Sequence, residues 1–295
     1  MITRRIIPFA LLILLVFSSV WSQDIDQMLE DATGSSTDYA TATFKSTRII
    51  NGHSIERMPN GQLDVRISHR FGQLNTGAYD LWGLDQSANI CLGLEYGITD
   101  WVMVGFSRSK LEKNFNGFLK FSILRQSKGE RNMPVSLSYF ASSSAYSLKW
   151  TGSGTLNFWD RVSYVHQLLV ARKFNERFSL EINPTYIHRN MVKTELDPND
   201  TWAAGAGARF KLTKRLSLNA EYYYVIPPIN DYRSTKTYNP LSVGVDIETG
   251  GHVFTIMLTN SLAMIEKGFI GETTGSWQDA GIHLGFNISR VFALK

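Results

Sequence analysis

From Gly61 to the C-terminus, the sequence consists of segments of about 9 to 15 residues in which apolar and polar side chains alternate. The clearest segment runs from Leu63 to Phe71, where the odd-numbered positions are Leu, Val, Ile, His and Phe and the even-numbered ones are Asp, Arg, Ser and Arg. Successive side chains of a β-strand point to opposite faces, so this pattern predicts a strand with one apolar and one polar face. No stretch with the period of an amphipathic helix competes with this interpretation.

Twelve segments of this kind can be drawn, and most reach the roughly 9 to 11 residues that a tilted strand needs to cross a bilayer. Soluble β-sandwiches and lectin-like proteins alternate too, but their strands are shorter, about five to six residues. Length therefore favours a transmembrane barrel. The predicted strands are residues 63–71, 88–98, 101–108, 114–125, 134–144, 160–174, 176–189, 201–212, 215–226, 240–249, 252–260 and 278–292.

The connections between these segments alternate between long and short along the chain, as in outer-membrane barrels with tight periplasmic turns and longer outer loops. Three short turns share one pattern, in which a polar residue (Thr99, Asn175 or Thr213) follows an apolar one. This pattern indicates hairpins that recur at one rim. We therefore predict an all-β fold, an antiparallel up-and-down transmembrane β-barrel of about twelve strands with periplasmic N- and C-termini.

The N-terminal residues have the layout of a secretory signal peptide. Arg4 and Arg5 precede an apolar run from Ile6 to Val20, and small or tolerated residues stand before Gln23. The alternative, an uncleaved anchor, needs a longer apolar run. The hydrophobic share of 43% is also too low for a polytopic helical membrane protein. Without the two arginines the balance is 28 basic (30 − 2) against 26 acidic residues, so nothing points to nucleic acid.

We accordingly divide the chain into a cleaved signal peptide (residues 1–22), a periplasmic N-terminal arm (23–60) and an outer-membrane barrel (61–295). The arm carries Lys45, Arg48 and Glu56 and is a candidate plug for the periplasmic mouth. The last long loop mixes apolar and charged residues, unlike an ordinary exposed loop, so it is a second candidate for closing the lumen or covering the rim for a partner. Its candidate constriction residues are Glu266, Lys267, Phe269 and Glu272.

Several runs resemble a Bacteroidota family of outer-membrane β-barrel proteins that is known only as a domain of unknown function. The resemblance covers nearly the whole mature chain, implies a barrel in the outer membrane, and supplies no activity, substrate or catalytic residue. The runs that carry it are Thr43–Arg48 with Asn51-Gly52, Ile67–Gly72, Gly83–Gln86, Leu94–Asp100, Ala171–Phe174, Leu218–Tyr224, Val245–His252, Glu266–Thr273 and Gly285–Arg290.

The polar faces of the strands predict a lumen lined by charges of both signs, without a ring of one sign. Such a lining either pairs across the lumen or forms a weakly selective channel. Two functions therefore stay open: a small-solute channel or transport-related barrel, and a sealed barrel that anchors or partners an outer-membrane complex. The candidate lumen and selectivity residues are Asp64, Arg66, Arg70, Glu95, Lys120, Glu181, Arg209, Lys211, Glu221, Asp246 and Glu248.

Covalent chemistry finds little support in the sequence. Ser68 and His69 are adjacent and suggest an outer-membrane lipid hydrolase, but neighbours on a strand cannot form a dyad. The six histidines and single Cys91 lack metal-site spacing, so no metal or cofactor is expected. Gly205 and Gly207 resemble a phosphate-binding fragment without its helix, and we interpret them as letting a strand curve or approach a plug. The expected partners are outer-membrane lipids, the barrel-assembly machinery during biogenesis and a small solute; a protein partner is not identified.

Overall fold

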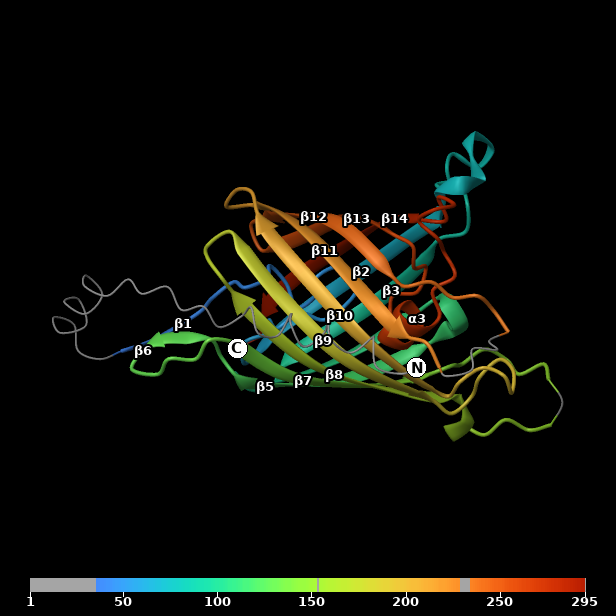
Figure 1. The fold of residues 1–295 in the computed structure, drawn as a ribbon, viewed down its shortest axis with the longest axis horizontal. Helices are drawn as coiled ribbons and strands as arrows, with labels where there is room; N and C mark the ends of the chain where they lie inside the picture. Colours follow the sequence, from blue (N-terminus) through green and yellow to red (C-terminus); the bar gives the residue numbers. More distant parts are fainter. Residues whose placement is uncertain (1–35, 153, 229–233, 295) are drawn as a thin grey trace, which may run out of the picture.

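The computed structural model describes residues 36–152, 154–228 and 234–294, and the predicted signal peptide lies outside this range. Twelve antiparallel strands form a closed barrel in which neighbours in the chain pair and β14 returns to pair with β2 (Figure 1). Closure leaves no unpaired sheet edge. The strands are β2 (Gln62–Gln73), β3 (Asn89–Gly97), β4 (Val102–Ser109), β5 (Phe115–Leu124), β7 (Ser136–Ala145), β8 (Val162–Lys173), β9 (Phe178–Arg189), β10 (Asp200–Lys211), β11 (Leu216–Ile226), β12 (Leu241–Thr249), β13 (His252–Thr259) and β14 (His283–Ala293).

The prediction of a twelve-stranded up-and-down barrel is confirmed, and the strand limits agree to within a few residues. The last strand is the main exception, because it begins at His283 and not at Gln278. Ahead of it the chain reverses: the Gly281 amide donates to the Ser276 carbonyl at 2.8 Å, and Ala280 has a φ of 49°. A backbone in this conformation cannot continue a strand.

The two faces of the barrel differ as the alternation predicts. On β2, Asp64 and Arg70 point inward and are buried, whereas Ile67 is exposed on the outside. On β3, Leu92 and Leu94 are outward and about half exposed. Continuous exposed apolar surface around a closed barrel is typical of contact with hydrocarbon. Among the described residues, no helix is long and apolar enough to cross a bilayer.

The barrel has two unlike ends. At the turn end, Gln62 lies opposite Ala293 and the connections between strands are short. Three of these turns are built alike: the side-chain oxygens of Thr99, Asn175 and Thr213 each accept hydrogen bonds from the backbone amides two and three residues later. The predicted recurrence of one hairpin type at one rim is thereby confirmed.

The loop end carries the long connections, with short 3-10 turns and one short helix, α3 (Glu266–Gly271), which lies within the barrel mouth (Figure 1). At the turn end, β1 (Thr37–Tyr39) pairs with β6 (Ser127–Gly129) in a small sheet that projects from the barrel (Figure 1). From Tyr39 the chain turns into the lumen, and it returns to begin β2 at Gln62. Segments from both ends of the barrel therefore occupy its interior.

Candidate functional site

The lumen holds a hairpin formed by residues 41–60, which we call the plug hairpin. Its two arms meet through an antiparallel bridge between Arg48 and His53, with the Ser54 amide donating to the Thr47 carbonyl at 2.9 Å. The turn is closed by the Ile49 amide, which donates to the Gly52 carbonyl at 2.9 Å. His53 is fully buried and Ile49 is nearly so. The hairpin thus replaces the water that would fill an open barrel of this size.

The plug hairpin brings its own apolar residues into the lumen. They pack with inward side chains of the barrel in one cluster: Phe44, Ile49, Ile50, Ile55 and Met58 from the hairpin, and Met103, Phe118, Phe140, Leu169, Ala171 and Met257 from the wall. Glycines make room for this contact. A Cβ on Gly207 would lie 2.3 Å from the Ile49 Cδ1 atom, and one on Gly205 would lie 2.4 Å from the Tyr223 ring. The interpretation of Gly207 as a point of close approach to a plug is confirmed.

Carboxylates of the wall bind backbone amides of the hairpin. Glu221 on β11 accepts hydrogen bonds from three consecutive amides, those of Ile50 (3.2 Å), Asn51 (2.9 Å) and Gly52 (3.1 Å). Glu181 on β9 accepts one from the Ile55 amide at 2.6 Å. Successive amides that point at one carboxylate form an anion nest, and charge-assisted bonds of this kind are stronger than neutral ones.

Cations of the wall bind backbone carbonyls of the same hairpin. The Lys120 ammonium donates to the Ser54 carbonyl at 3.0 Å and to that of Glu56. The Arg209 guanidinium donates to the carbonyl of Ala42 at 2.7 Å. Lumen groups of both charge signs therefore bind the backbone of the plug hairpin, because a backbone offers N–H donors to the carboxylates and C=O acceptors to the cations. This explains why the lining has no ring of one sign.

Side-chain charges also join the wall, the hairpin and α3. Asp64, Arg66, Glu95, Arg48 and Glu266 alternate in sign along one line of contacts, which we call the charge chain. The successive N–O distances are 2.9, 3.8, 3.5 and 2.7 Å. Its first three members belong to the wall, Arg48 to the plug hairpin and Glu266 to α3. Burial by itself lowers the pKa of Arg48, but the carboxylates of Glu266 and Glu95 outweigh it, so its pKa is raised and the guanidinium stays charged.

His53 is the member of the hairpin whose ring nitrogens both lack a hydrogen-bond partner within the described part of the chain. Its ring lies between Phe118 and Phe140, with centroids 4.5 and 4.2 Å away, and neither ring nitrogen has a hydrogen-bond partner. The Nε2 atom is 3.8 Å from the Glu266 carboxylate. Burial lowers the pKa of His53 well below its ordinary value, and the nearby charge of Arg48 lowers it further. The ring is therefore neutral at pH 7.

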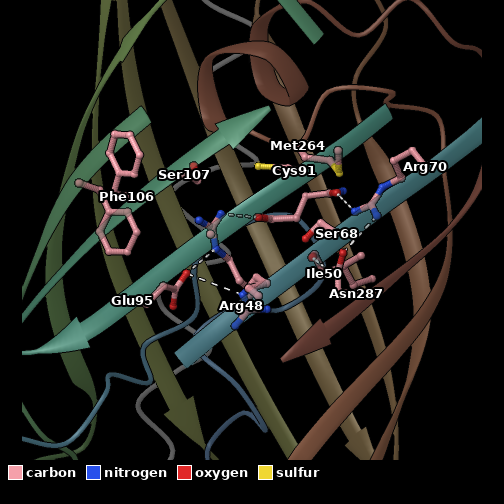
Figure 2. Close-up of a pocket in the computed structure, with 14 residues that line it drawn as sticks. Arg48, Ile50, Ser68, Arg70, Cys91, Glu95, Phe106, Ser107, Met264 and Asn287 are labelled. Carbon is pink, nitrogen blue, oxygen red and sulfur yellow. Dashed lines mark hydrogen bonds and ion pairs between the residues drawn. The ribbon is translucent and has the colours of Figure 1, made fainter. Parts of the chain in front are cut away.

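Arg70 binds the tip of the hairpin without a carboxylate partner among the described residues. Its guanidinium donates to the side-chain oxygens of Asn51 (2.6 Å) and Asn287 (3.1 Å). Beside it is a cavity of about 30 Å³, which Cys91 also lines (Figure 2). A polar cavity of this size holds one or two waters and is too small for a solute. The lumen is thus closed at its middle.

The loop end is closed by α3. Phe269 is fully buried and its ring meets that of Tyr223 edge to face at 5.4 Å. Lys267 forms ion pairs with Glu112 (2.7 Å) and Glu272 (3.7 Å), and Glu272 also contacts the Arg189 guanidinium at 3.4 Å. The four residues proposed as a constriction, Glu266, Lys267, Phe269 and Glu272, therefore lie together in the mouth of the barrel. Their effect on permeation remains a prediction.

The other predicted lumen residues lie on the inward side of the strands. Asp246 is buried and accepts hydrogen bonds from Asn219 (2.6 Å) and Thr255 (2.7 Å). Glu248 pairs with Lys45 near the start of the plug hairpin. Lys211 is half-buried at the turn end of β10. The structure thus brings eight of the eleven candidates into direct contact with the hairpin, and in the described part of the chain Asp64, Lys211 and Asp246 make no direct hydrogen bond or ion pair with it.

Sequence reasoning missed Asn51 and His53 of the hairpin, and it missed the apolar part of the site, which includes the inward rings of Phe118, Phe140 and Tyr223. A signal was present in the alternation itself. On β5, Phe118 is in phase with Asn116 and Lys120, so it must point into the lumen with them. A large ring on the polar face has no place in a water-filled pore and indicates that something apolar lies against it.

Ser68 and His69 are on opposite faces, as expected. Ser68 is buried inward, whereas the His69 ring stacks outside the barrel on Phe286 at 4.9 Å. Within the described residues no group of three or more His, Cys, Asp or Glu side chains is placed to hold a metal ion.

Comparisons with known proteins agree with this architecture. A family model described as Membrane bound beta barrel domain (DUF5777) matches residues 44–292, a range that includes most of the plug hairpin and almost the whole barrel. No curated protein matches the chain. Similar solved structures include the NanC porin (10% identity, 78% of this chain and 98% of that one, TM-score 0.48) and an outer-membrane channel from Pseudomonas putida F1 (14%, 81% and 98%, TM-score 0.47). Outer membrane phospholipase A from Escherichia coli is also similar (12%, 78% and 88%, TM-score 0.39).

Proposed function

This chain belongs to the family of membrane-bound β-barrel domains, and from that premise we propose that it is an outer-membrane channel for small solutes that the plug hairpin holds closed. In this state the protein excludes solutes. Passage requires the hairpin to leave the lumen. No covalent chemistry takes part in this function.

The outer membrane is supported by the exposed apolar face of the strands and by the export signal expected at residues 1–22. In this orientation the turn end, with the β1–β6 sheet and the C-terminal strand end, faces the periplasm, and the loops face outward. We extend the proposal to an origin in the Bacteroidota, which the runs quoted above support.

The observation that carries the channel function is how the plug hairpin is bound. Wall charges hold its backbone through hydrogen bonds, as Glu221, Lys120 and Arg209 do, and water can replace each of these bonds when the hairpin departs. The surface left behind is then a polar, mixed-charge passage of weak ion selectivity. The hairpin is also tied at both ends on one side, by β1 and by β2, so it can leave and return without unfolding the barrel.

A second function is favoured by a different observation. Met103, Phe140 and Leu169 are completely buried on the lumen side, as in the core of a soluble protein. Exposing them to water costs roughly 1.5–3 kcal/mol per side chain, which favours a permanently sealed barrel. Such a barrel would act as an anchor or partner in an outer-membrane complex.

Conductance separates the two functions. Purified protein is placed in a planar bilayer beside a variant in which residues 44–57 are replaced by a Gly-Ser segment of the same length, so that β1 and β2 keep their positions. We expect rare stepwise openings of the wild type and frequent openings of the variant. A wild type that never opens, together with a variant that conducts steadily, supports the sealed anchor instead. If the folded variant is silent as well, the channel proposal is wrong.

A further inference from the structure

A second cavity, which we call the vestibule, lies at the loop end and is separate from the plug hairpin. Its volume is about 430 Å³, in the range of pockets that bind small molecules. Four long loops and the region of α3 contribute to it. The residues on which its chemistry depends are Tyr146, Trp150, Arg161, Arg189, Lys193 and Glu272.

Two cations of the vestibule, Arg161 and Lys193, have unused binding capacity. Lys193 is exposed, and among the described residues none pairs with its ammonium group. Arg161 uses its guanidinium for one hydrogen bond to a backbone carbonyl, that of Leu148 at 2.8 Å. Arg189 lines the same space, but its guanidinium already binds Glu272 at 3.4 Å and the Pro198 carbonyl and Thr201 hydroxyl at 2.9 Å each. Arg161 and Lys193 are therefore the two cations whose donors remain available to a ligand in this space.

The acids of the vestibule, in contrast, are already occupied. Asp197 accepts hydrogen bonds from Thr194 and Ser234, including 2.7 Å from the Ser234 hydroxyl. Burial raises its pKa, and these hydrogen bonds outweigh that effect and lower it overall, so the carboxylate stays ionised. Glu112 and Glu272 are neutralised by Lys267 and Arg189. The vestibule is thus prepared for an anion and not for a cation.

One wall of the vestibule is aromatic. Trp150 is 42% exposed there, and the Arg161 guanidinium lies 5.8 Å from the centre of the Tyr146 ring. Flat apolar rings beside charged donors suit a ligand that has a ring-shaped body and one anionic group. We propose that the vestibule binds small organic carboxylates with a sugar-like or planar ring, with the carboxylate at Arg161 and Lys193, beside the ion pair of Arg189 and Glu272.

The floor of the vestibule connects this ligand to the plug hairpin, a step that rests on the proposed channel function. Glu272 contacts both Arg189 and Lys267, and Glu266, at the other end of α3, binds Arg48 of the plug hairpin. A carboxylate that competes with Glu272 for Arg189 loosens the hold of the wall on α3. Binding from outside therefore favours release of the plug hairpin, and the anion is both ligand and cargo.

Calorimetric titration of the full-length protein in detergent tests binding with three pyranose sugars of similar size: glucuronate, glucose and glucosamine. All three are soluble and do not partition into micelles, and only the first carries a carboxylate. We expect glucuronate to bind at least about tenfold more tightly than glucose, and glucosamine to bind least. The double variant Arg161→Gln/Lys193→Gln and the variant Trp150→Ala are each expected to weaken glucuronate binding by about tenfold or more, whereas Lys214→Gln at the opposite end leaves it unchanged.

Equal affinity for glucuronate and glucose, a preference for glucosamine, or no measurable binding of any of them overturns the proposal. Loss of binding in the Lys214→Gln control overturns it as well. The test is independent of transport: glucuronate binding in a protein that never conducts refutes the channel function alone, and conductance without binding refutes the vestibule site alone.

Discussion

The Arg48 guanidinium donates a hydrogen bond to the Glu266 carboxylate across 2.7 Å, although the two residues are 218 positions apart and enter the barrel from opposite ends. The Glu266 side chain is fully buried and that of Arg48 is 10% exposed. This pair is the one direct ion pair between the plug hairpin and α3 in the described chain, if the longer His53 contact is set aside. Two closures of the lumen thus depend on each other.

Replacing Arg48 with Met is expected to release the plug hairpin, because it leaves the Glu266 carboxylate buried without its cation. Breaking a buried pair in this way costs about 3–5 kcal/mol. Cys91 is buried in the lumen and is the single cysteine of the chain, so its reaction with a hydrophilic thiol reagent reports access to the cavity. We expect labelling to become at least about 100-fold faster. Adding Glu266→Gln to Arg48→Met is expected to restore part of the protection. If Cys91 of the single variant Arg48→Met is labelled as slowly as in the wild type, this account of the pair is contradicted.

Glu221→Gln is expected to raise the open probability of the channel in planar bilayers. The amide has one acceptor oxygen and no charge, so it cannot hold all three backbone amides of Ile50, Asn51 and Gly52. A loss of about 1.5–3 kcal/mol in hairpin binding corresponds to a roughly 10- to 150-fold gain in opening. The control is Glu176→Gln, which changes an exposed carboxylate in the β8–β9 turn at the turn end of the barrel. An unchanged open probability would show that the nest does not hold the hairpin.

Gly52→Ala tests the fit of the hairpin tip without removing a charge. The new Cβ would lie 2.2 Å from the Tyr223 hydroxyl oxygen and 3.3 Å from the ring carbon that carries it. We expect faster labelling of Cys91 and partial recovery in Gly52→Ala/Tyr223→Phe, where the clashing oxygen is gone. Gly117→Ala, whose new Cβ would meet only the Gly105 carbonyl oxygen at 4.0 Å, serves as control. Absence of recovery in the double variant would place the cause elsewhere than in this contact.

Acidification is expected to open the channel through His53. Burial lowers the pKa of this ring well below its ordinary 6.5, and the charges of Arg48 and Lys120 act in the same direction, whereas the Glu266 carboxylate nearby opposes them. The bound hairpin therefore takes up fewer protons than the released one. Its stability is complete above the ordinary pKa and falls as the pH drops through 6.5 toward the lowered value.

Open probability should accordingly rise by at most about tenfold per pH unit below pH 6.5, since one proton is taken up. His53→Phe fits between Phe118 and Phe140 without a titrating group and is expected to lose this component. Recordings of both proteins at the same pH isolate the contribution of His53. Identical pH profiles for the two would rule out His53 as the origin.

The barrel could be predicted from the sequence because the residues of each strand show by themselves which face is apolar and which is polar. Ile67 and Leu92 face outward and Asp64 and Arg70 inward, and period-2 alternation shows this locally. The turns at Thr99 and Asn175 are equally local, because the side-chain oxygen of each residue accepts a hydrogen bond from the backbone amide three residues later. Such features need no knowledge of distant contacts.

The site could be predicted only in part because it joins distant segments. Alternation identified Glu221 as a lumen residue, but nothing near it in the sequence shows that its ligand is the backbone of residues 50–52. Likewise, the pairing of Arg48 with Glu266 depends on two segments that lack strand periodicity altogether. The arm and the last long loop were predicted as candidates for closing the lumen, and the inward Phe118 and Phe140 agree with a filled lumen, but none of these features shows which atoms meet.

The double tether of the plug hairpin makes it an intramolecular inhibitor. Because β1 and β2 fix both of its ends beside the same mouth, a released hairpin stays at an effective concentration in the millimolar range, whatever the amount of protein in the membrane. Resealing is then a first-order process that needs no second protein. In the proposed channel, a barrel built in this way is closed by default, and its leak is set by how long the hairpin remains outside the lumen.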